Sequence, residues 1–184
     1  MHPTSPRVHP LALESLDGEA HEILAGFVRG GEAPNIFSTL AHHPKLLKRW
    51  RVFATHILNK STLPAREREL LILRIGWRAR APYEFSHHVR IGRRAGLTTE
   101  DIERIKLGPD AQGLDPFDAA LLVAVDELDT DTCLSDSTWK QLSERFDTQQ
   151  MIDLVFTVGQ YKMVSMALNS LGVQPEELAP EFSS

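Results

Sequence analysis

Apolar residues recur every three or four positions along most of the chain, which is the spacing of an amphipathic α-helix. No segment alternates apolar and polar residues over the length of a strand, so the sequence predicts no sheet. Glycine, proline and capping residues separate the successive helical segments. The predicted helices cover residues 16–28, 35–41, 44–58, 64–79, 82–95, 99–107, 116–128, 136–146 and 149–171.

These segments predict an all-α fold, a compact single-domain helical bundle. Gly30 and Gly31 should end the first helix, and Thr148 should cap the last one before Gly172 ends it. No low-complexity linker divides the chain. We therefore expect an N-terminal extension over 1–14, one helical domain over 15–174, and a peripheral tail over 175–184.

Two segments, 70–77 and 151–168, are apolar on nearly every face. A helix of this kind must be covered on all sides. Either both are central helices of one chain, or part of their surface is buried against another subunit. We favour a homo-oligomer, and the methionines at 151, 163 and 166 suit an adaptable interface.

Composition narrows the class of protein. The chain of 184 residues is 42% hydrophobic and 24% charged, as in ordinary globular proteins. Its single cysteine, Cys133, excludes an intrachain disulfide, a cysteine-based zinc site and a CxxC redox pair. The N-terminus lacks the apolar core of a signal peptide, and no run of 18 residues is free of charge, so we expect a cytoplasmic protein without membrane contact.

Charge is distributed unevenly along the chain. Residues 45–94 hold 13 of the 20 lysines and arginines but only three of the 25 acidic residues. Ion pairs to the acidic remainder, within or between subunits, would explain this, as would a positive field that attracts a small carboxylate substrate. A nucleic-acid surface fits less well, because the segment carries no recognised nucleic-acid-binding motif, and we expect no nucleic-acid partner.

Proton-transfer groups are densest at residues 84–88. Pro82 suits the first turn of a helix, where Glu84 meets the positive end of the helix dipole. His87 and His88 follow at i+3 and i+4, so both imidazoles can lie near this carboxylate. The opposing effects of dipole and carboxylate predict that His88 titrates near neutral pH. The plainer interpretation is an ordinary Glu–His hydrogen bond on a surface or at an interface.

A metal site is the other chemistry to test. Glu84 and His87 form a Glu-x-x-His pair, but a di-iron carboxylate bundle needs two such pairs and two further glutamates. No other glutamate in the chain has a histidine three residues later. We therefore expect neither a metal nor another cofactor.

Three runs carry a family resemblance: RERELLILR at 66–74, YEFSHHVRIGRRAGLTTEDI at 83–102, and GQYKMVS at 159–165. Together they resemble the carboxymuconolactone decarboxylase family, whose superfamily includes the alkylhydroperoxidase D proteins. The resemblance implies an all-α fold assembled as trimers or hexamers. It also implies a role for Glu69, on the helix that precedes Glu84.

The peroxidase branch of this superfamily uses a Glu-x11-Cys-x2-Cys-x3-His arrangement. Glu69 and His88 match its ends, whereas Ala81 and Glu84 occupy the two cysteine positions. A dithiol peroxidase needs thiolates as nucleophiles, so this activity is excluded. The decarboxylase branch, which acts on a muconolactone acid in aromatic catabolism, instead resembles the chain in its Glu84–His88 spacing.

We therefore expect a cofactor-free lyase that decarboxylates or isomerises a small anionic, lactone- or aromatic-derived substrate. His88 is the expected proton donor or acceptor, oriented by Glu84, with Glu69 and His87 assisting. Tyr83 and Arg74 are the expected substrate-binding residues. The alternative is a non-catalytic or regulatory helical oligomer that retains the family pocket, and an enclosed pocket beside the Glu–His pair would favour the enzyme.

Overall fold

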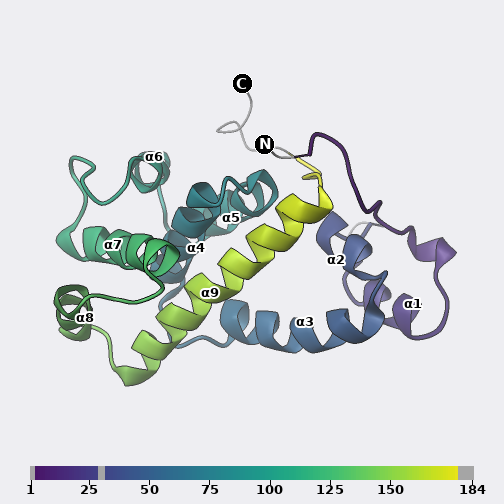
Figure 1. The fold of residues 1–184 in the computed structure, drawn as a ribbon, viewed down its shortest axis with the longest axis horizontal. Coiled ribbons are helices and arrows are strands. Elements are labelled where there is room, and N and C mark those ends of the chain that lie inside the picture. Colours follow the sequence, from purple (N-terminus) through teal and green to yellow (C-terminus); the bar gives the residue numbers. More distant parts are fainter. Residues whose placement is uncertain (1–2, 29–31, 178–184) are drawn as a thin grey trace.

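The computed structural model describes residues 3–28 and 32–177, and within them it is helical without strands, as predicted (Figure 1). A short 3₁₀ turn, Leu13–Ser15, precedes the first α-helix. The α-helices are α1 (Gly18–Ala25), α2 (Asn35–Leu40), α3 (Pro44–Asn59), α4 (Ala65–Arg78), α5 (Pro82–Arg94), α6 (Thr99–Leu107), α7 (Pro116–Thr130), α8 (Asp136–Ser143) and α9 (Thr148–Leu171).

The helix ends lie close to their predicted positions, with two corrections. The first helix ends at Ala25 with Gly26 as its C-cap, and Gly30 and Gly31 lie outside the described residues. The N-cap of α9 is Asp147 rather than Thr148, because Asp147 and Gln150 form a reciprocal capping box that satisfies two free backbone N–H groups.

Helix α4 is the centre of the bundle and packs against α5, α7 and α9 (Figure 1). Its apolar residues from Leu70 to Ile75 are fully buried within one chain. For this segment the structure therefore supports the alternative of a central helix rather than burial against another subunit. The long helix α9 runs diagonally across the molecule and joins α4–α8 on one side to α3 on the other. This position places one face of α9 beside both α3 and α5.

Basic residues of α4 pair with acidic residues of α7 at a constant separation. Arg66 donates to both carboxylate oxygens of Asp118 at 2.8 and 2.6 Å, and Arg74 donates to both of Asp126 at 2.8 and 2.7 Å. In both pairs the partners are 52 residues apart in sequence. The equal separation shows that α4 and α7 run in the same direction.

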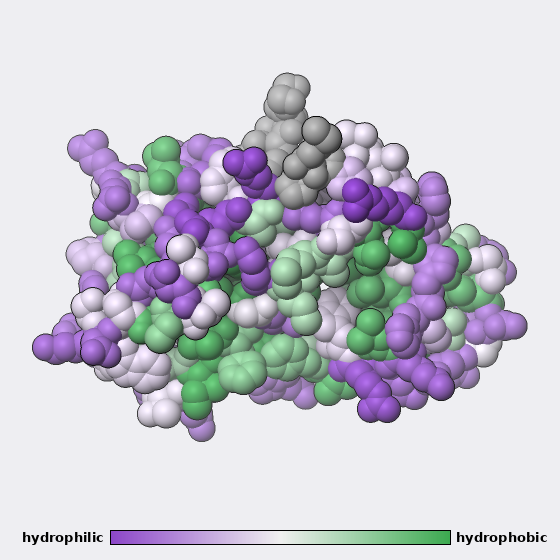
Figure 2. All heavy atoms as spheres, viewed as in Figure 1, coloured by the Kyte–Doolittle hydropathy of each residue, from purple (hydrophilic) through white to green (hydrophobic). Residues whose placement is uncertain are grey.

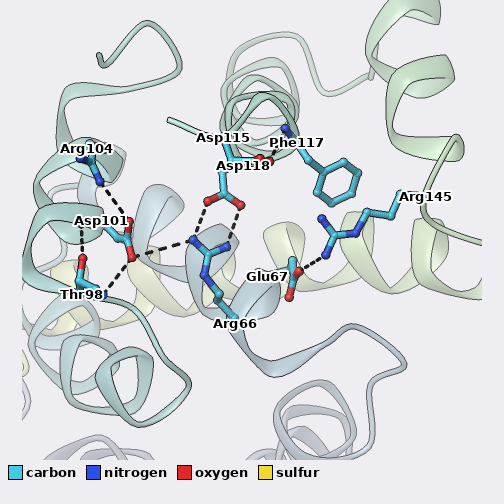
Figure 3. Close-up of polar contacts among 9 residues, drawn as sticks. All are labelled: Arg66, Glu67, Thr98, Asp101, Arg104, Asp115, Phe117, Asp118 and Arg145. Carbon is cyan, nitrogen blue, oxygen red and sulfur yellow. Dashed lines mark hydrogen bonds and ion pairs between the residues drawn. The ribbon is translucent and has the colours of Figure 1, made fainter. Parts of the chain in front are cut away.

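The network continues at the N-terminal end of α4, as Figure 3 shows. Glu67 accepts a hydrogen bond from Arg145 at 2.7 Å, and the Arg145 guanidinium lies 4.4 Å from the centre of the Phe117 ring. The basic charge of α4 is thus neutralised within one chain. This supports the ion-pair interpretation of the charge asymmetry for this helix.

The N-terminal segment packs along the end of α9. The backbone N–H of Arg7 donates to the Leu171 carbonyl at 2.9 Å. Gly172 ends α9 with φ of 69°, and a Cβ there would lie 2.7 Å from the Ser5 carbonyl oxygen, so both the backbone and the close contact favour glycine. Of the expected tail, residues 178–184 lie outside the described residues.

A row of exposed residues follows the outer face of α9 at alternating steps of four and three. It consists of Ile152, Phe156, Gly159, Met163 and Met166. Figure 2 shows apolar surface gathered where α9 crosses α3, and the Phe53 and Phe156 rings meet there. Met151, expected at an interface, is instead buried in the core.

Within the described residues, no helix is both long enough and apolar enough to span a membrane.

We predict that this row packs against another subunit, because the four- and three-residue spacing is that of helix–helix seams. Light scattering should give a trimer or hexamer rather than a 20.7 kDa particle. Phe156→Glu, which places a charge at a 54% exposed ring, should lower the particle mass. Trp139→Glu is the matched control, since Trp139 is similarly exposed but lies on α8. A monomer at micromolar concentration would contradict the prediction.

Candidate active site

The expected Glu–His pair lies at the start of α5. Pro82 occupies the first helical turn and places Glu84 in that turn, one helical turn before His88. Glu84 Oε1 and His88 Nε2 are 3.0 Å apart, and both side chains are buried. The i,i+4 spacing read from the sequence therefore gives a direct hydrogen-bonded ion pair.

Glu69, on α4, meets the other side of the same imidazole. Its Oε2 lies 2.6 Å from His88 Nδ1, and its side chain is fully buried. The Arg68 guanidinium lies 3.4 Å from the remaining oxygen, Glu69 Oε1. His88 thus lies between two carboxylates, and each of its ring nitrogens has one of them as partner.

This environment determines the charge of His88. Burial alone would lower the pKa of His88, but the charges and hydrogen bonds of Glu69 and Glu84 outweigh it and raise the pKa to about 9. The expectation of titration near neutral pH is therefore wrong, because it counted one carboxylate where the fold supplies two. At neutral pH His88 is therefore an imidazolium held between Glu69 and Glu84.

A pocket of about 310 Å³ opens beside the Glu69–His88–Glu84 triad, between α2, α3, α5 and α9. Glu84 and His88 line it, whereas Glu69 lies behind them. Its other walls are largely aromatic and aliphatic, among them Phe37 and Trp50. The site is thus a partly enclosed, mostly apolar pocket with ionisable groups on one wall.

Two polar side chains of α9 also line this pocket, and the sequence analysis did not single them out. Gln160 is 4% exposed, and its Oε1 is shut off from solvent with no hydrogen-bond partner among the described residues. Tyr161 packs edge-on against the His88 ring, with ring centres 4.9 Å apart. Burial raises the pKa of the Tyr161 phenol well above its ordinary value, as do the charges of Glu84 and Glu69, so the hydroxyl stays protonated.

The Gln160 Oε1 atom is buried without a hydrogen-bond partner among the described residues. Such an atom lowers the stability of a fold by about 1–3 kcal/mol and is uncommon in native proteins. The pair left two signals in the sequence: it interrupts the apolar run of 151–168, and it lies in GQYKMVS, one of the runs that carry the family resemblance. Neither signal shows which way the side chains face. Only the packing of α9 against α5 places them beside His88.

The expected residues Tyr83 and His87 line the pocket at the point where the chain's C-terminal segment crosses α5. The Tyr83 hydroxyl accepts from the Ile36 backbone N–H at 3.2 Å and donates to Glu176 Oε1 at 3.1 Å. His87 Nε2 donates to Glu176 Oε2 at 2.7 Å. The Asn35 backbone N–H also donates to Glu176 Oε1. Both expected residues are therefore engaged with Glu176, which joins α2 to α5.

We predict that Glu176→Gln lowers the free energy of unfolding by about 1–2 kcal/mol, a value reduced for partial solvent exposure. Burial would raise the pKa of Glu176, but hydrogen bonds from His87 and the Asn35 N–H hold it at about 2. The stabilisation is therefore complete above pH 4.5 and is lost as the pH falls toward 2. Urea titrations test this, with the more exposed Glu177→Gln as control. Equal effects of the two substitutions would contradict it.

Arg74 does not reach the pocket, contrary to expectation. Its guanidinium is buried between α4 and α7, where it pairs with Asp126 and donates to the carbonyls of Ile105 and Lys106 at 2.8 and 3.1 Å. Each of the three guanidinium nitrogens thus donates to a partner inside the fold. Arg51, at the exposed rim on α3, is the arginine that lines the pocket.

Ala81 occupies one of the two positions at which the peroxidase branch has a cysteine. Ala81 caps α5 and is fully buried, and Cys133 is exposed in the segment between α7 and α8. Across residues 3–28 and 32–177 no group of three or more histidine, cysteine or acidic side chains is placed to hold a metal ion.

Comparison with known proteins agrees with this geometry. The family model for the carboxymuconolactone decarboxylase family matches residues 44–126, which contain Glu69, Glu84 and His88. No curated protein sequence matches the chain.

Solved structures share the fold at low sequence identity. An uncharacterized peroxidase-related protein from Ralstonia eutropha JMP134, with an alkylhydroperoxidase AhpD core, is 19% identical, has a TM-score of 0.81, and covers 96% of this chain and 95% of its own. A peroxidase-related protein from Silicibacter sp. TM1040 is 15% identical with a TM-score of 0.77, covering 98% and 96%. A cysteine-to-alanine variant of the debrominase Bmp8 in complex with 2,3,4-tribromopyrrole is 16% identical with a TM-score of 0.74, covering 92% and 91%.

Proposed function

We propose that the chain, whose residues 44–126 match the carboxymuconolactone decarboxylase family, is a cofactor-free enzyme that transfers protons at a carbon atom of a small unsaturated substrate. The reaction is a decarboxylation or an isomerisation. The observation that carries the proposal is the buried Glu69–His88–Glu84 triad at the wall of a pocket. An ion pair without a cavity would instead have favoured the non-catalytic oligomer.

The geometry changes the expected division of roles. Both ring nitrogens of His88 are already hydrogen-bonded, so in this arrangement the imidazole has no free nitrogen for a substrate. Glu84 lines the pocket and accepts from His88 Nε2. We assign direct proton exchange with the substrate to Glu84, while His88 supplies and retrieves protons through the hydrogen bond of 3.0 Å. Glu69 holds His88 in place and keeps it charged.

The substrate class follows from the pocket walls. Aromatic and aliphatic side chains favour a flat, unsaturated ring, and Arg51 at the rim offers a partner for a carboxylate. Bmp8, which shares the fold, binds a small halogenated ring compound, 2,3,4-tribromopyrrole. We therefore propose a small anionic lactone or aromatic-derived acid.

Thiol peroxidase chemistry is not part of this proposal. Glu84 and Ala81 occupy the two positions where the peroxidase branch has cysteines, and neither side chain provides a thiolate. The related structures called peroxidase-related are only 19% and 15% identical to this chain, so they support the fold and not that reaction.

The test is an NMR assay in D₂O with small unsaturated γ-lactones, each with and without a carboxylate substituent. The expected result is catalysed deuterium incorporation beside the carbonyl, double-bond migration, or loss of CO₂ from the acids. The purified protein should also fail to consume a hydroperoxide with a dithiol reductant. Peroxide turnover without any proton exchange would overturn the proposal.

A further inference from the structure

We propose that the Gln160 amide and the Tyr161 hydroxyl form a pair of hydrogen-bond donors that stabilises an enolate oxygen of the substrate. The inference rests on the proposed function and adds its substrate class, a ketone, ester or lactone with a carbonyl beside the reacting carbon. Both residues lie on α9 and line the same pocket as Glu84 and His88.

The first support is that these two groups are buried without protein partners. Gln160 and Tyr161 are each more than nine-tenths buried. The amide oxygen of Gln160 is shut off from solvent and unpaired, and the side chain lines the pocket, so we infer that the Nε2 end is the one turned toward a ligand. The Tyr161 hydroxyl has no hydrogen-bond partner among the described residues. The Tyr83 hydroxyl, in contrast, is already bonded to the Ile36 N–H and to Glu176.

The second support is that both groups can act as hydrogen-bond donors. An amide NH₂ donates hydrogen bonds, and a phenol kept protonated by its surroundings is also a donor. Two donors that line the same apolar pocket are suited to an oxygen that carries negative charge. A carbonyl oxygen acquires such charge only during the reaction, so the pair stabilises the transition state more than the bound substrate.

The third support is the charge balance of the step. Glu84 takes a proton from the carbon beside the carbonyl, the electrons of the broken C–H bond form a C=C bond, and the carbonyl π pair moves onto oxygen. One negative charge thereby moves from Glu84 to the enolate oxygen. Reprotonation by Glu84 at another carbon restores the carbonyl and gives the isomer. In decarboxylation the C–C bond to the carboxylate supplies the electron pair and CO₂ leaves. The His88 imidazolium passes a proton through Glu84 to the carbon, and water then reprotonates His88.

This charge transfer explains why the donors lie on a different helix from the base. The wall formed by α5 carries Glu84 and His88, and a negative charge can develop beside Glu84 only as Glu84 takes up the proton. The donors on α9 receive the charge at the other end of the reacting unit. The Tyr161 ring also packs on His88, so the donor and the triad hold each other in position.

The test uses 4-nitrophenolate, a stable aromatic analogue of an enolate, in mildly alkaline buffer. Glu84→Gln mimics the protonated carboxyl and should bind this anion, with a shifted absorbance spectrum. In that background, Gln160→Met and Tyr161→Phe should each weaken binding by about tenfold or more, the effect of losing a hydrogen bond to a charged group. Thr55→Val removes a hydroxyl from the exposed rim of the same pocket and should change the affinity by less than about twofold.

Circular dichroism is the control that each variant is folded. The two donor variants test the inference separately. Absence of phenolate binding by the Glu84→Gln protein, or unchanged affinity in either folded donor variant, would overturn the inference. Donor-dependent binding in a protein that catalyses no proton exchange on any lactone would support the donor pair and overturn the proposed function instead.

Discussion

Glu84→Gln is expected to lower the rate of proton transfer by about 10²–10⁴-fold, the usual contribution of a positioned general acid or base. The amide keeps the shape of the side chain and can still accept from His88 Nε2, but it cannot take a proton from carbon. The measurement is kcat/KM for the most active lactone, with helix content and particle mass recorded alongside. His88→Ala should cause a loss of similar size.

The matched control for this substitution is Glu67→Gln. Glu67 is also a buried glutamate in the same bundle, but it faces Arg145 away from the pocket. Its replacement should reduce stability and leave kcat/KM within about threefold, since effects away from a site are modest. Full activity of the Glu84→Gln enzyme, or equal losses in the two variants, would show that the triad is a structural ion pair.

The second large effect concerns stability at alkaline pH. The pKa of His88 is about 9 in the folded chain against an ordinary value of 6.5. A raised histidine pKa stabilises the fold fully below pH 6.5, and this stabilisation is lost as the pH rises through 9. The shift corresponds to roughly 3 kcal/mol. Urea unfolding at pH 6 and pH 9.5 should show a decrease of this order.

His88→Ala provides the reference for this pH dependence, because it removes the titrating group together with its two ion pairs. The variant should be less stable than the wild type at pH 6 and should lose far less stability between pH 6 and pH 9.5. A wild-type protein equally stable at both values would show that the two carboxylates do not hold His88 in its charged form.

Much of this fold could be predicted from local patterns. Proline at the start of α3, α5 and α7, and the capping box of Thr98 and Asp101, fix helix ends through neighbouring residues alone. The all-round apolar run of α4 indicated its central place. The Glu84–His88 pair was predictable for the same reason, because one helical turn sets its geometry.

The rest of the site depends on contacts between distant segments. The sequence suggested Glu69 only through the family resemblance, and its bond to His88 results from the packing of α4 on α5. The sequence suggested that Arg74 could bind a substrate, but in the fold its guanidinium pairs with Asp126 of α7. Gln160 and Tyr161 were read as part of an apolar helix, since periodicity does not show which neighbour a face will meet.

The walls of the pocket come from distant parts of the chain, and this affects the order in which they fold. Its outer walls come from α2 and α3, whereas the opposite wall is α9, and the Asn35 side chain is fastened to the Gln174 carbonyl 139 residues later. Contacts this distant form late and slowly compared with the neighbouring α4–α5 pair. During synthesis, α2 and α3 emerge from the ribosome well before α9, and their apolar faces stay exposed until α9 has been made. Chaperone dependence should therefore concentrate in this half of the chain.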